Sequence, residues 1–149
     1  MTGNAAIYSS GPPPELSFFE DYPSAKNVQA ILSADGVPSR YSLEINGTHL
    51  TLNVMPHSEV QAHLNGFMGY IYHLHHVTPS GHTQPLLVRL KDIRTILGVI
   101  VEPDYDEQEQ AAQLVWSVAE SLDALVFAAS SVFSCSGEPL VGPAAGAEA

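Results

Sequence analysis

The sequence has little cysteine, few basic residues and no long apolar run. Its single cysteine, Cys135, has no partner for an internal disulfide, and a thiolate metal site would need more sulfur. Five basic residues stand against 16 acidic ones, and the formal net charge of -11 would repel a nucleic-acid backbone. No apolar run approaches the roughly 20 residues of a membrane span. We therefore expect neither nucleic acid nor a membrane as a partner.

The N-terminal segment also lacks the features of a secretory signal. It begins MTGNAAIYSSGPPPE, without a basic start followed by an apolar stretch. The sequence therefore predicts a cytoplasmic protein.

The residues that are present fit one folded domain. The chain has 149 residues, of which 45% are hydrophobic and 14% charged, a composition too apolar for a disordered protein. Residues 1–14, with three consecutive prolines, and residues 143–149 contain few large apolar side chains, so we expect both to be flexible tails. This leaves residues 15–142 as a single domain.

The first half of this domain is predicted to contain a hairpin. Asn46 and Gly47 favour a two-residue turn, because a type I′ turn needs positive φ at both central positions. The flanking residues 41–45 and 49–55 are the expected strands. Upstream, the apolar residues 16–20 are typical of an edge strand. Ser24 resembles a helix N-cap, and Gly36 marks the end of the helix that we expect between them.

The second half is predicted to be mostly helical. We expect helices over 58–75, 86–97 and from about 106 to 122, a buried strand at 99–101, a strand at 125–127 and a small hairpin around 136–137. Asp104 and Glu107 resemble a capping box for the last helix. The predicted fold is therefore α+β, in the order β-α-β-β-α-α-β-α-β. Its mixed sheet contains the hairpin and is covered by about four helices.

Several segments together resemble a known family. They are NGFMGYIYHL, ILGVIVEPDYDEQ, VAESLDALVF and SGEPLVG, and the shared order of apolar and glycine landmarks covers roughly residues 16–142. The chain is similar to the N-terminal portion of a bacterial two-part family of unknown function, whose longer helical domain would begin where this chain ends. The resemblance implies an α+β fold and supplies no catalytic residues. Such families are sometimes encoded near toxin and immunity genes, which supports a protein-binding role.

No catalytic or cofactor-binding motif is present in the sequence. It has no G-x-S-x-G elbow, no phosphate-binding glycine loop and no zinc signature, so we predict no catalytic residue, cofactor or metal. The acids at 104–109 lack the glycine of an EF-hand loop and fit a helix N-terminus better. The histidines leave one alternative open, a small-molecule sensor or enzyme that uses the histidine-rich segment 57–82. Its candidate residues are His63, Tyr70, His73 and His76.

The leading hypothesis is a non-catalytic protein-binding module of a regulatory or immunity-like kind. Trp116 lies on the far side of its helix from the apolar stripe, and exposed tryptophan is enriched at interaction hot spots. Gln113, Glu109 and Glu120 would form a polar rim around it. The expected partner is another protein or a second copy of this chain.

Overall fold

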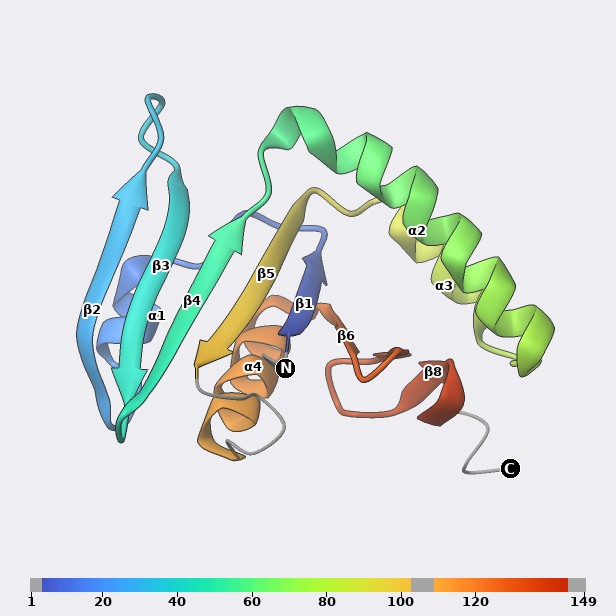
Figure 1. Ribbon diagram of the computed structural model, residues 1–149. Helices are drawn as coiled ribbons and strands as arrows, with labels where there is room; N and C mark the ends of the chain where they lie inside the picture. Colours follow the sequence, from blue (N-terminus) through green and yellow to red (C-terminus); the bar gives the residue numbers. More distant parts are fainter. Residues whose placement is uncertain (1–3, 103–108, 145–149) are drawn as a thin grey trace.

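The computed structural model describes residues 4–102 and 109–144, which form one sheet with helices on both of its faces (Figure 1). The elements follow one another along the chain as β1 (Asn4–Ser9), α1 (Leu16–Glu20), β2 (Ala25–Leu32), β3 (Pro38–Ile45), β4 (Thr48–Val54), α2 (His57–Val77), α3 (Thr83–Leu90), β5 (Thr95–Glu102), α4 (Glu109–Leu122), β6 (Leu125–Ala128), β7 (Ser131–Phe133) and β8 (Pro139–Val141).

The sheet has eight strands in the order β2-β3-β4-β5-β1-β6-β7-β8. Every pair of neighbouring strands in the described residues is antiparallel, so the expectation of a mixed sheet is wrong, although the α+β class holds. The reason is the position of β1. It enters between β5 and β6 and runs antiparallel to both, which leaves no parallel neighbours.

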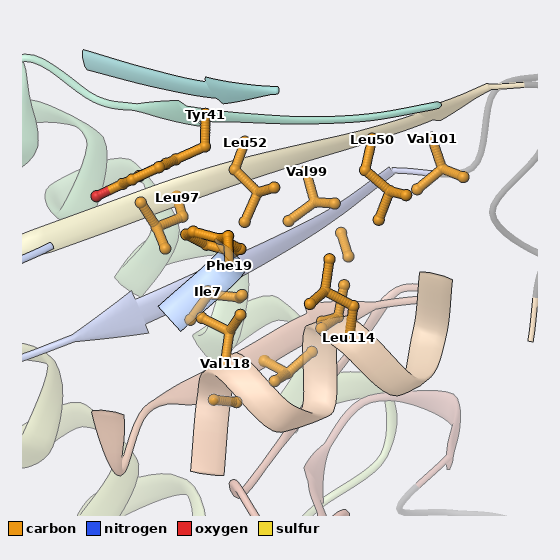
Figure 2. Packing of buried hydrophobic residues seen from close by; sticks show 14 of the residues in the cluster. Ile7, Phe19, Tyr41, Leu50, Leu52, Leu97, Val99, Val101, Leu114 and Val118 are labelled. Carbon is orange, nitrogen blue, oxygen red and sulfur yellow. The ribbon is translucent and has the colours of Figure 1, made fainter. Parts of the chain in front are cut away.

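The larger core lies between the sheet and the helices α1 and α4, which are behind the sheet in Figure 1. Figure 2 shows Leu114 and Val118 of α4 directed toward Ile7 of β1, with Phe19 of α1 beside them. All four side chains are completely buried. At roughly 1.5–3 kcal/mol for each large apolar side chain, such burial is the main force that holds these layers together.

A second core lies under α2 and α3, on the opposite face of β1 and β6. Successive side chains of a strand point to opposite faces, so Ile7 belongs to the first core and Tyr8 to the second. In α2, Val60, Leu64, Phe67 and Ile71 are buried at helical spacing, as the sequence predicted. The sheet is thus covered on both faces where β1 passes through it.

Residues 4–9 correct the prediction of a flexible N-terminal tail. They form β1, whose Ala5, Ile7 and Tyr8 are buried in the two cores. The segment NAAIYS is short and precedes a run of prolines, so its apolar residues did not predict a strand. A strand paired on both sides and covered on both faces needs no strict alternation of apolar and polar residues.

Two further segments exchange their predicted states. Residues 16–20 form helix α1 rather than a strand, which lets Phe18 contact Tyr22 one turn later at a centroid distance of 6.4 Å. Residues 25–32 form edge strand β2 rather than a helix, with Ser24 at a φ of 69° before it. Pairing with β3 overrides the apparent helical spacing, and Ile31 and Leu32 stay exposed.

The predicted helix over 86–97 is divided between two elements. Helix α3 ends at Leu90, and β5 begins at Thr95. Ile93 and Leu97 are buried as their apolar character indicates, but they belong to a turn and a strand rather than to one helical stripe. The expected capping acids Asp104 and Glu107 lie outside the described residues.

The turn between β3 and β4 contains the asparagine–glycine pair. Ile45 pairs with Thr48 across it, and Asn46 and Gly47 have φ values of 49° and 86°. Two successive positive φ angles are the geometry of a type I′ turn.

Candidate binding groove

The described part of the chain has a groove at one end of the sheet, with a volume of about 1130 Å³. Four segments that are distant in sequence line it: residues 10–13 after β1, the β2–β3 turn from 33 to 39, the link from β4 to α2 at 54–57, and residues 94–95 at the start of β5. In Figure 1 these segments meet at the upper edge of the sheet, where the β2–β3 turn projects beyond its neighbours.

The β2–β3 turn owes its shape to polar contacts within it. The Ser33 hydroxyl donates to the Asp35 carboxylate and also lies 3.0 Å from the Val37 carbonyl, and the Val37 N–H donates to the Asp35 carboxylate at 3.3 Å. Gly36 has a φ of 83°, a conformation that glycine adopts at little cost. The hydrogen bond from Ser33, followed by that from Val37, lowers the pKa of Asp35 below its ordinary value. The carboxylate is therefore already engaged within the turn.

The segment after β1 is held on the opposite wall. The Thr95 hydroxyl donates to the Gly11 carbonyl at 2.6 Å, and the Arg94 N–H donates to the Ser9 carbonyl at 2.9 Å. The buried Tyr41 hydroxyl donates to the Pro14 carbonyl. These bonds fix the proline-rich segment against the sheet, so both walls are in place without a ligand.

Two nitrogen-bearing side chains in the groove have no partner. Neither the Arg94 guanidinium nor the His57 imidazole forms a hydrogen bond or ion pair within the described residues, and both residues are exposed. His57 is the first residue of α2, whose N-cap position is taken by Pro56 without a side-chain cap. The groove therefore offers unoccupied hydrogen-bond donors.

Exposed apolar side chains border these donors. Val37 lines the groove and is 41% exposed, while Ile31 and Leu32, at the adjoining end of β2, are 55% and 59% exposed. Val54 and Met55 line the groove from the β4–α2 side. We call Val37, Ile31 and Leu32 the apolar rim.

Trp116 lies elsewhere, and its surroundings differ from the expectation of an uncovered side chain. Its ring is half-buried against the first core and meets Phe133 of β7 edge to face at 5.7 Å. Gln113 and Glu120 are exposed as expected, whereas the side chain of Glu109 lies outside the described residues. The sequence could not show that β7 supplies the missing apolar neighbour.

No hydrogen bond or ring contact joins two of the four residues of the histidine hypothesis within the described part of the chain. His63 shares a 2.9 Å hydrogen bond with the Tyr8 hydroxyl, whose burial raises the pKa of Tyr8 well above its ordinary value. Tyr70 packs against Phe127 at a centroid distance of 5.8 Å. His73 and His76 are exposed. Within residues 4–102 and 109–144, no group of three histidine, cysteine or acidic side chains could hold a metal ion.

His75 has a structural position between α2 and α3. Its Nδ1 accepts the Ser80 N–H at 3.0 Å and lies 2.8 Å from the Thr83 hydroxyl. The structure has His75 half-buried and hydrogen-bonded to the loop that joins the two helices.

The groove was missed by the sequence analysis because none of its segments carries a motif. Arg94 belongs to no sequence motif, and the proline run was predicted to be part of a flexible tail. Arg94 and the proline run lie next to each other because β1 pairs with β5.

Comparison with known proteins gives no relative from which a role could be transferred. No family model matches the chain, and neither a curated protein nor a solved structure is significantly similar to it. Among the described residues, no helix has the length and apolar character needed to cross a membrane.

Proposed function

We propose that this chain is a non-catalytic protein-binding module that takes an extended segment of a partner into the groove. The observation that carries the proposal is a groove of about 1130 Å³ lined by the exposed Val37, with the exposed Ile31 and Leu32 at the adjoining end of β2. Exposed apolar side chains beside a hollow are typical of sites that bind other molecules.

The size of the groove favours a peptide over a small metabolite. Pockets for drug-sized compounds have volumes of roughly 300–1,000 Å³. This groove is larger and is bordered by side chains such as Leu32, which is 59% exposed. An extended segment could cover both the groove and its rim, whereas a compact molecule would leave the rim in water.

The rigidity of the walls also supports a binding role. Hydrogen bonds within the β2–β3 turn and from Thr95 to Gly11 hold both walls without a ligand. A site that is already ordered loses little conformational entropy on binding, so more of the interaction energy contributes to affinity.

Selection from a random-peptide phage library tests this proposal. We expect the wild-type chain to enrich a recurring apolar pattern, and Val37→Asn to weaken binding of the selected peptides by about tenfold, since a buried valine contributes roughly 1.5 kcal/mol. Val88→Asn is the matched control, because Val88 is 60% exposed on α3 and does not line the groove.

Two results would contradict the proposal. One is the absence of any enriched peptide. The other is an equal loss of binding in Val37→Asn and Val88→Asn, which would place the contact outside the groove. The first result would leave the alternative of a small-molecule sensor built on the histidine-rich segment 57–82, and the second would leave a peptide site elsewhere on the chain.

A further inference from the structure

Among the arginines, Arg94 alone has no acceptor for its side chain within the described residues. Arg40 donates to the Asn53 side chain at 2.8 Å, and Arg89 contacts both the carbonyl and the carboxylate of Asp123. Arg94 forms no such contact, although the whole chain carries 16 acidic residues. Arg94 lines the groove, and the hydrogen-bonding capacity of its guanidinium is unused.

The acidic residue in the groove does not neutralise this charge. Asp35 lines the groove, but no ion pair joins it to Arg94. Its carboxylate instead accepts from the Ser33 hydroxyl and the Val37 N–H within its own turn. A ligand that enters the groove thus meets an available cation and a carboxylate that is already engaged.

We infer that the occupant of the groove is a peptide segment that carries a carboxylate next to apolar side chains, and that Arg94 binds this carboxylate. The inference rests on the proposed function and specifies its ligand. A guanidinium presents two parallel N–H groups that match the two oxygens of a carboxylate. His57, on the β4–α2 side, supplies a further N–H donor.

The position of Arg94 suits this role. Its own backbone N–H is bonded to the Ser9 carbonyl, so the base of the side chain is held at the start of β5. Met55, Val54 and Val37 line the same groove and provide apolar contacts. An acidic side chain flanked by apolar residues, or an apolar C-terminus, would place a carboxylate among all of them.

A double-mutant cycle between peptide and protein tests the inference. A peptide selected by the wild-type chain is synthesised with its carboxylates intact, with acidic side chains changed to amides, and with an amidated C-terminus. Affinities for wild type and Arg94→Gln are measured by fluorescence anisotropy. We expect removal of one carboxylate to weaken wild-type binding by about tenfold and to have little effect on Arg94→Gln. If amidation of the acidic side chains weakens binding, Arg94 binds a side-chain carboxylate. If amidation of the C-terminus weakens binding, Arg94 binds the C-terminal carboxylate.

Lys91→Gln is the matched control, because it removes the same charge from an exposed side chain three residues away that does not line the groove. We expect Lys91→Gln to retain the full sensitivity to the carboxylate. Equal sensitivity in wild type and Arg94→Gln overturns the inference while the groove remains a peptide site. The inference is likewise overturned if no carboxylate of the selected peptides contributes to their affinity for the wild-type chain. If no peptide is selected at all, the proposed function and this inference both fail.

Discussion

The ring of Trp116 meets the ring of Phe133 edge to face, with centroids 5.7 Å apart and planes inclined by 86°. This contact joins α4 to β7, and both rings also pack against the larger core. Edge-to-face aromatic pairs contribute about 0.5–1.5 kcal/mol beyond the area they bury. Trp116 therefore has an apolar neighbour within the fold, and its contact with a protein partner stays a prediction.

The first prediction concerns this aromatic pair. Trp116→Ala should lower the free energy of unfolding by about 2 kcal/mol, since a half-buried tryptophan loses less than the 3–5 kcal/mol measured for fully buried large aromatics. Urea unfolding of Trp116→Ala, Phe133→Leu and the double variant gives the coupling, expected at about 1 kcal/mol. Unchanged stability in Trp116→Ala would restore the earlier hypothesis of a free contact surface formed with Gln113 and Glu120.

The second prediction concerns the turn between β3 and β4. Gly47→Val should destabilise the fold by about 1 kcal/mol or more, because Gly47 has a φ of 86° that a β-branched residue resists. No atom lies within 4 Å of a Cβ built at this position, so the effect is one of backbone strain rather than of a clash.

Gly69→Ala serves as the comparison for this variant. Its Cβ would also meet open space, but the residue lies inside α2, where alanine is favoured over glycine by about 1 kcal/mol. We expect opposite signs for the two variants in thermal melts. A neutral Gly47→Val would contradict the turn geometry.

The third prediction concerns stability at high pH. Burial raises the pKa of Tyr41 from 10.0 to about 12 and raises the pKa of Tyr8 as well. Above pH 10 the unfolded chain loses these protons while the folded chain keeps them. Stability should therefore be complete below this pH and fall as the pH rises toward about 12.

Absorbance of tyrosinate during an alkaline titration provides the measurement. We expect Tyr8 and Tyr41 to ionise only as the fold is lost, and Tyr8→Phe and Tyr41→Phe to remove that late fraction of the signal. Ionisation of Tyr8 and Tyr41 before unfolding would contradict the burial of these two residues.

Long amphipathic helices were the part of the fold that the sequence predicted best. In α2 the apolar stripe of Val60, Leu64, Phe67 and Ile71 repeats over several turns. Few structures other than an amphipathic helix fit such a pattern. Leu114, Val115 and Val118 play the same part in α4. The β-branched run from Val99 to Val101 likewise predicted a strand, which lies in the second half of β5, but Ile100 is 36% exposed rather than buried.

Short segments could not be predicted because their state depends on distant partners. Val28, Ile31 and Leu32 are spaced as on a helix, yet pairing with β3 makes them a strand. Ile7 and Tyr8 were predicted to belong to a flexible tail. They are part of the sheet because β1 pairs with β5 on one side and with β6 on the other. The groove depends on the same long-range pairing, since Arg94 reaches the proline segment only through β1.

Chemical-shift mapping by amide NMR tests the central claim most directly. A peptide selected by the wild-type chain is titrated into the labelled protein, and the residues whose amide signals move are assigned. We predict the largest changes at Val37, Met55 and Arg94, on three separate segments that meet only at the groove. Changes confined to Gln113, Trp116 and Glu120, or to His63, Tyr70, His73 and His76, with the groove signals unmoved, would contradict the account.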